Sequence, residues 1–203
     1  MSDMEPVHLA GFPEPLRWDV SPAAWTMEGD QELRIMAGPR TDLFTDPQRT
    51  AVWSNAPRLL FTPVGDFVLQ ARVTVTFAAT YDAGVLLLYG AEQVWAKLCF
   101  EFSPQAEPMI VSVVTRDFSD DSNSTIVLDR SVLLRVARIG PAFAFHWSSD
   151  GGFWHFVRHF TLPGADSVAI GFASQSPTGE GCEARFSEIA FAARRLDDLR
   201  NGL

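Results

Sequence analysis

The segment FVLQARVTVTF, residues 67–77, alternates apolar and polar side chains over most of its length. Its odd-numbered positions from Leu69 to Phe77 are apolar, and its even-numbered positions from Gln70 to Thr76 are polar. Successive side chains of an extended strand point to opposite faces, so a period of two indicates a β-strand with one buried face. This segment therefore predicts a sheet that covers a core on one side.

Similar short runs recur along the chain, and turn-forming residues separate them. Strands at near-regular spacing without a convincing helix predict an all-β sandwich or barrel. A chain of 203 residues is a usual length for one such domain, so we expect a single domain over residues 1–203, with its core at about 15–191. The best helical candidate is the tail Ala192–Arg200. The other expected strands are Leu16–Val20, Glu32–Ala37, Arg58–Phe61, Gly84–Tyr89, Val94–Phe102, Met109–Arg116, Val132–Ile139, Phe143–Trp147, Phe153–Phe160, Ser167–Ser174 and Cys182–Phe191.

Two of these runs are joined by a segment that contains Asp150 and Gly151, a dipeptide typical of hairpin turns. The second run contains His155 and His159, which at helical spacing would suggest a zinc site. On a strand the two imidazoles stand about 13 Å apart, too far to share one ion. We therefore expect a hairpin here and no metal site.

Composition excludes several classes of partner. The chain carries 25 acidic and 16 basic residues, a net charge of −9, and Lys97 is its only lysine. Nucleic acids and anionic membranes require clustered cations, so neither is expected as a partner. Cys99 and Cys182 do not have metal-ligand spacing and are expected to be reduced. Met1–Ala10 lacks the pattern of a signal peptide, and no apolar run is long enough to span a membrane, so a cytoplasmic location is predicted.

An ordered set of motifs extends over nearly the whole chain: Thr41–Phe44, Asn55–Pro57, Gly65–Phe67, Tyr81–Tyr89, Trp95–Lys97 with Glu101, Ser112–Thr115, Asp117–Ser119, Ser149–Gly151 with Trp154 and Arg158, and Gly171–Pro177. In this order they resemble the uncharacterised bacterial and fungal family of the regulation-of-enolase protein, which belongs to the concanavalin A-like lectin/glucanase superfamily. The resemblance implies a concanavalin A-like jelly-roll sandwich of two antiparallel sheets, and it implies no established reaction. Phe118 stands where the family pattern has tryptophan, which keeps an aromatic ring but removes the indole N–H.

The run Val94–Phe102 offers the clearest candidate site. Trp95, Lys97 and Glu101 share one face of the expected strand. Residues two positions apart, such as Trp95 and Lys97, are separated by about 6.8 Å. A sugar site needs an aromatic plate and polar groups for hydroxyls, which this row would supply. The alternative is a cross-strand ion pair shielded by the tryptophan. Further expected ligand-binding residues are Tyr81, Asp82 and Trp154.

Three functions remain open. The first is binding of a carbohydrate or a sugar-like small molecule in a groove on the concave sheet. The second is a regulatory or protein-interaction module without catalysis, and a homodimer is left open. The third is glycoside hydrolysis, which needs two carboxyl groups at set separations. Jelly-roll glucanases commonly place them on one strand, but Glu101 has Lys97 and Cys99 on its own face. We therefore expect no catalytic residue and no cofactor.

Overall fold

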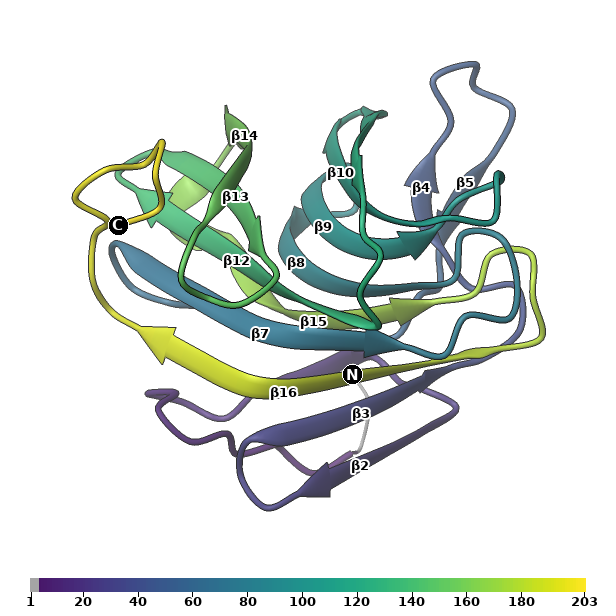
Figure 1. The fold of residues 1–203 in the computed structure, drawn as a ribbon, viewed down its shortest axis with the longest axis horizontal. Coiled ribbons are helices and arrows are strands. Elements are labelled where there is room, and N and C mark those ends of the chain that lie inside the picture. Colours follow the sequence, from purple (N-terminus) through teal and green to yellow (C-terminus); the bar gives the residue numbers. More distant parts are fainter. Residues whose placement is uncertain (1–3) are drawn as a thin grey trace.

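The computed structural model describes residues 4–203, so the first three residues of the segment Met1–Ala10 lie outside the described part. Two large antiparallel sheets of seven strands each stack face to face (Figure 1). The predicted alternating segment forms β7, Phe67–Val75, in the middle of one sheet. The all-β sandwich expected from the sequence is confirmed.

The first sheet, called the β9 sheet, contains the predicted ligand strand. In spatial order its strands are β1 Arg17–Val20, β6 Arg58–Phe61, β15 Ala169–Gln175, β8 Ala83–Ala91, β9 Val94–Phe102, β10 Pro108–Arg116 and β11 Phe118–Ile126. The second, called the β12 sheet, contains β14 His155–Thr161, β13 Ala142–Ser148, β12 Ser131–Ile139, β7, β16 Cys182–Ala192, β3 Glu32–Ala37 and β2 Ala24–Glu28. A separate hairpin pairs β4 Leu43–Thr45 with β5 Val52–Ser54, and the single 3₁₀ turn of the described chain is η1 Ala165–Ser167.

The core lies between the two sheets and is rich in aromatic rings. Phe172 of β15 and Phe186 of β16 come from opposite sheets, and their ring centroids are 5.1 Å apart. Val73 of β7 and Leu98 of β9 are both fully buried in the same cluster. Burial of such side chains contributes roughly 1.5–3 kcal/mol each, which is the main force that holds the sheets together.

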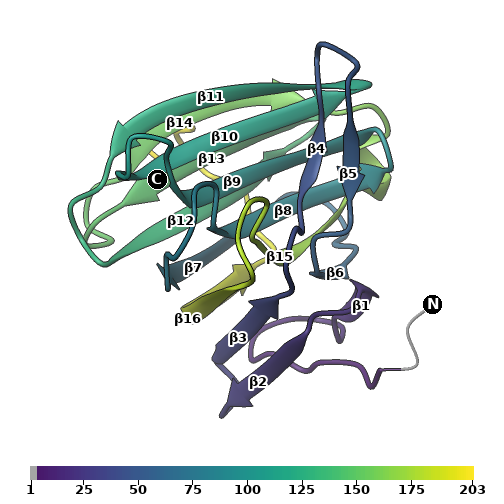
Figure 2. The ribbon, with the colours of Figure 1, turned by 90° about the vertical axis from the view of Figure 1, so that its right-hand side faces the viewer.

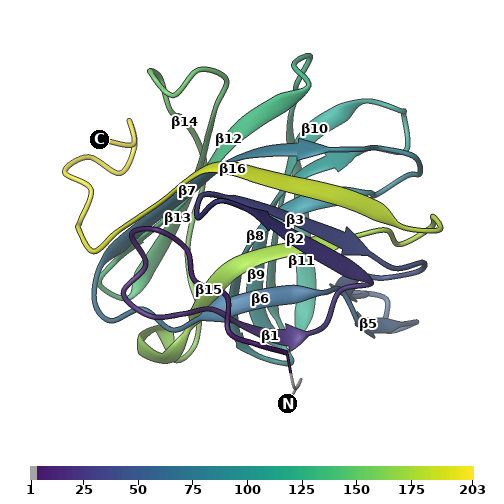
Figure 3. The ribbon, with the colours of Figure 1, turned by 90° about the horizontal axis from the view of Figure 1, so that it is seen from below.

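Sequence periodicity missed several elements. No strand was predicted over β11, whose sequence FSDDSNSTI is almost entirely polar and includes most of the acidic segment Asp117–Asp121. The short strands β2, β4 and β5 were not predicted either. The tail Ala192–Arg200, the best helical candidate, contains no helix and instead lies beside β12 and β13 (Figure 3). The predicted hairpin is confirmed as β13 and β14, and Gly151 adopts a φ of +83° in its turn.

The outermost strands of the two sheets are tied together on one side of the sandwich. Arg158 of β14 forms an ion pair of 3.0 Å with the carboxylate of Asp120 on β11. The same guanidinium donates a hydrogen bond of 3.1 Å to the backbone carbonyl of Asp120. Both strands stand last in their sheets, so this contact bridges the gap between two sheet edges.

No helix among residues 4–203 is long and apolar enough to cross a membrane.

Candidate functional site

The outer face of the β9 sheet, which points away from the β12 sheet, is organised by strand register. On β9, Lys97 stands opposite Val113 of β10 and Leu87 of β8. Four positions along, Glu101 stands opposite Met109 and Ala83. Directly paired residues project to the same face, so the two charged side chains rise from an apolar floor.

The β4–β5 hairpin covers part of this face, as Figure 2 shows. Trp95 is fully buried in an apolar cluster with Leu43 of β4 and Ala56, which follows β5. Its ring centroid lies 5.8 Å from Lys97 Nζ, within the range of a cation–π contact. Trp95 was predicted to bind a ligand, but it has no exposed surface and does not line the pocket on this face.

Beside the hairpin the same face opens into a pocket of about 500 Å³. This volume lies within the range of small-molecule sites, roughly 300–1,000 Å³. Its floor is apolar, its rim carries exposed aromatic rings, and its polar groups come from five separate parts of the chain. The lining residues are Asp42, Phe44, Trp53, Tyr81, Lys97, Glu101, Ser103, Pro104, Gln105, Met109, Val111, Val113, Asp121, Asn123, Gln175, Pro177 and Thr178.

Lys97 is held at the centre of a polar network. Its Nζ donates to Asp42 Oδ1 at 3.2 Å and to Gln175 Oε1 at 2.9 Å. Gln175 in turn donates to the backbone carbonyl of Tyr81 at 3.1 Å. Burial alone would lower the pKa of Lys97, but attraction by Asp42 and Glu101 outweighs it and raises the pKa. Lys97 is therefore a permanent cation whose charge is neutralised by a neighbour.

Glu101 is the other buried ionisable group of the pocket, with 8% of its surface exposed. Burial raises its pKa to about 7, although Lys97 opposes that rise. Its carboxyl group receives no hydrogen bond from any residue of the described chain, 4–203. Buried polar groups are nearly always hydrogen-bonded, so a carboxyl that faces an open pocket without a protein partner is available to a ligand.

The raised pKa of Glu101 predicts a dependence of stability on pH. The folded protein binds this proton more tightly than the unfolded chain, whose ordinary pKa is 4.5. The stability from Glu101 is therefore fully present below the unfolded pKa and is lost as the pH rises through about 7. We expect Glu101→Gln to unfold less readily than the wild type above pH 7, by up to about 3 kcal/mol, with little difference near pH 4.

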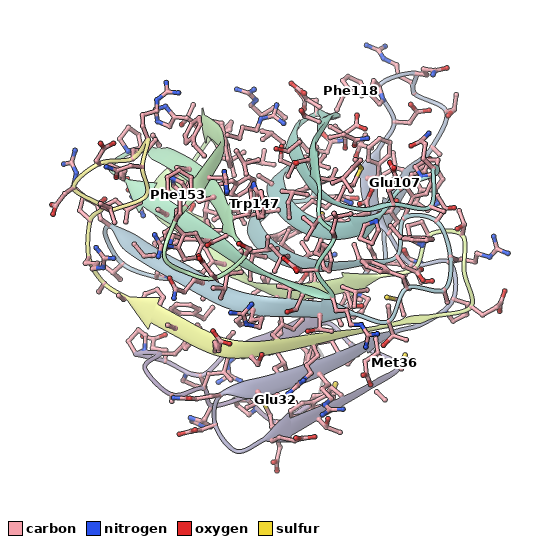
Figure 4. All side chains as sticks on the ribbon, viewed as in Figure 1. Glu32, Met36, Glu107, Phe118, Trp147 and Phe153 are labelled. Atoms are coloured by element: carbon pink, nitrogen blue, oxygen red, sulfur yellow. The ribbon has the colours of Figure 1, made fainter. Side chains whose placement is uncertain are left out.

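Urea unfolding at several pH values measures this difference. Glu107→Gln is the matched control, since Glu107, labelled in Figure 4, lies directly before β10 and does not line the pocket. A pH-independent difference between Glu101→Gln and the wild type would contradict the assignment of a buried, proton-binding carboxyl.

Tyr81 and Asp82 occupy the turn that leads into β8 and have different roles. Tyr81 is 40% exposed and lines the pocket. Its backbone adopts a left-handed φ of +70°. Asp82 is fully buried and accepts hydrogen bonds from the backbone N–H groups of Ala78 and Ala79 and from the hydroxyl of Ser176. Asp82 therefore holds the turn that positions Tyr81 and does not itself line the pocket.

Trp154 does not join this pocket. It packs on the β12 sheet, where the guanidinium of Arg135 lies 3.4 Å from its ring centroid. Arg135 also donates to Gln70 and to the carbonyl of Gly202, so the C-terminal segment covers the cluster. Arg135 lies on β12 and Glu101 on β9, so the two side chains belong to different sheets and do not pair.

Most of the pocket lining was not predicted from the sequence, and three of the missed residues matter most for the site. Asp42 precedes β4, Trp53 lies on β5 with 43% exposure, and Gln175 ends β15. Gln175 comes from a motif that the sequence had singled out, Gly171–Pro177, but no periodicity connects it with Lys97. Within the described residues, no three His, Cys, Asp or Glu side chains form a group suited to hold a metal ion.

Solved structures share the fold at low sequence identity. A functionally unknown protein from Saccharomyces cerevisiae superposes with a TM-score of 0.82 at 23% identity, over 88% of this chain and 96% of that one. The GH43 protein BlXynB from Bacillus licheniformis gives 0.66 at 16% identity over 86% of this chain and 36% of its own. The alginate lyase from Klebsiella pneumoniae gives 0.55 at 11% identity, over 83% of each chain. The chain thus spans about a third of the GH43 protein.

These similarities show a shared fold. No curated protein matches the sequence. A family model described as "Protein of unknown function (DUF1349)" matches residues 18–194, which include both large sheets except part of β1. The chain therefore belongs to the DUF1349 family of proteins of unknown function.

Proposed function

We propose that this protein binds a carbohydrate or a sugar-like small molecule in the pocket on the outer face of the β9 sheet. The observation that carries the proposal is the meeting of exposed aromatic rings, Trp53 and Tyr81, with the buried, unpartnered carboxyl of Glu101 in one cavity of about 500 Å³. Aromatic faces pack against the apolar side of a sugar ring, and polar groups select its hydroxyls.

The arrangement of polar groups also supports a sugar. Asn123 and Gln105 add amide groups to the wall, and Glu101 adds a strong acceptor. Met109, Val111 and the other floor residues supply apolar surface without competing hydrogen bonds. GH43 proteins and an alginate lyase carry a similar sandwich, which makes saccharides the natural first ligands to test. The regulation-of-enolase assignment remains a proposal, and it adds no ligand of its own.

Calorimetric titration and thermal shift with xylo-oligosaccharides, glucose and amino sugars test the proposal. We expect binding by at least one saccharide and a loss of affinity of roughly fivefold or more in Trp53→Ala, because ring stacking contributes at least about 1 kcal/mol. Phe153→Ala is the matched control: its ring is 63% exposed, and Figure 4 places it across the molecule from Glu107.

Binding that survives in both Trp53→Ala and Tyr81→Ala would overturn the pocket as the site. Absence of binding across the panel, with the protein folded, would overturn the proposed function. It would then favour the protein-interaction module, for which a larger apolar surface would have to be found.

A further inference from the structure

The charged side chains that line the pocket differ in whether the protein supplies them with a hydrogen-bond partner. Among the lining residues Lys97 is the only cation, and it already donates to Asp42 and Gln175. Asp42 is in turn occupied by Lys97 and by the backbone N–H of Leu43 at 2.7 Å. The carboxyls of Glu101 and Asp121 accept no hydrogen bond from the described protein. The pocket therefore offers a ligand unpaired negative acceptors and no unpaired cation.

From this imbalance we infer that the preferred ligand is a saccharide with a protonated amino group, an amino sugar, whose ammonium lies against the carboxyl of Glu101. The inference rests on the proposed function and narrows its substrate class. It also predicts discrimination against sugars that carry a carboxylate or a phosphate.

Geometry supports an ammonium at this place. Glu101 is nine-tenths buried and faces the pocket without a partner, and an ammonium would supply both a counter-charge and up to three hydrogen-bond donors. An uncompensated buried charge is costly, so a cation that fills this position gains the full strength of a charge-assisted hydrogen bond. Trp53 and Tyr81 on the rim add π faces that attract cations.

Among the charged neighbours of Glu101, only Lys97 opposes a cation at this place, and Asp42 offsets its charge. Lys97 and Cys99 precede it on β9; burial raises the pKa of Cys99, so this thiol is neutral. Asp42, ahead of β4, neutralises Lys97, and Asp121 of β11 adds a further negative charge. Tyr81, in the turn before β8, is the remaining ionisable residue that lines the pocket with Glu101. The sum of the charges at the open side of the pocket is negative, which attracts an ammonium and repels an anion.

Calorimetric titration of the wild type with glucosamine, N-acetylglucosamine and glucuronate tests the inference at about pH 7.5. The first two differ at one position, where acetylation removes the charge. We expect glucosamine to bind at least about tenfold more tightly than N-acetylglucosamine, and glucuronate to bind more weakly than either. Lowering the pH to about 5.5 should protonate Glu101 and reduce the preference for glucosamine.

Glu101→Gln keeps the shape of the side chain and removes its charge. We expect this variant to bind glucosamine and N-acetylglucosamine with equal affinity at both pH values, and Glu107→Gln to retain the preference. Equal affinities in the wild type, or tightest binding of glucuronate, would overturn the amino-sugar inference while the sugar site stands. Failure of all three ligands and of the neutral oligosaccharides would overturn the proposed function itself.

Discussion

Replacement of Gly171 by alanine is expected to destabilise the protein by more than about 3 kcal/mol, a large part of the stability of a typical domain. Gly171 lies on β15 opposite Leu60 of β6 and Leu87 of β8. A Cβ at this position would lie 1.9 Å from the carbonyl oxygen of Leu59, an atom of the backbone. A side chain could rotate away from such a contact, but a strand held on both sides must move as a whole. The expected result is partial or complete unfolding.

Gly38→Ala provides the matched control for that variant. The nearest atom to a Cβ at Gly38 is 4.0 Å away, on Ala23, and its backbone lies outside the left-handed region. We expect a change within about 1 kcal/mol, with a gain if the added methyl restricts the unfolded chain. Denaturant unfolding of both variants measures the two costs. Equal stability of Gly171→Ala and Gly38→Ala would contradict the close approach of β6 and β15.

Replacement of Lys97 by methionine is expected to cost about 3 kcal/mol of unfolding free energy. Methionine retains an unbranched stem of similar length, so the cavity term is small. The loss comes from Asp42, which would keep its charge in a largely covered position without a cation, and from Gln175, whose Oε1 would lose its donor. Removing one member of a buried pair leaves the other uncompensated.

A double-mutant cycle separates this loss from a general packing effect. We expect Lys97→Met combined with Asp42→Asn to be less destabilised than the sum of the single changes, because the second substitution removes the stranded charge. Denaturant unfolding of the four proteins measures the coupling. Strictly additive costs would contradict a direct interaction between Lys97 and Asp42.

Most of the fold could be predicted from periodicity because its long strands bury one face. β7 is the clearest example, since its buried positions coincide with its apolar residues. β11 could not be predicted this way, as its sequence is polar on both faces and its place is set by pairing with β10. The three-residue strands β4 and β5 are too short to establish a period.

The candidate site was predicted in part, because the alternation of β9 shows which side chains share a face. Period two correctly placed Lys97 and Glu101 on the face opposite the core. It also placed Trp95 there, but could not indicate that the β4–β5 hairpin, far away in the chain, would cover that ring. Asp42 and Gln175 lie 55 and 78 residues from Lys97, and only the tertiary fold brings them together. Alternation identifies the face of a strand but not its sheet, which is why Trp154 was grouped with the wrong neighbours.

The bridge between β14 and β11 bears on how separate copies of the chain behave in concentrated solution. An outermost strand exposes unpaired backbone groups that can recruit a strand from another molecule, which is a common beginning of aggregation. The guanidinium of Arg158 occupies the backbone carbonyl of Asp120, one of the acceptors that an incoming strand would need. Asp121 places a carboxylate on the same strand, and a second copy paired along β11 would bring like charges to this edge. Intermolecular sheet extension along β11 is therefore disfavoured.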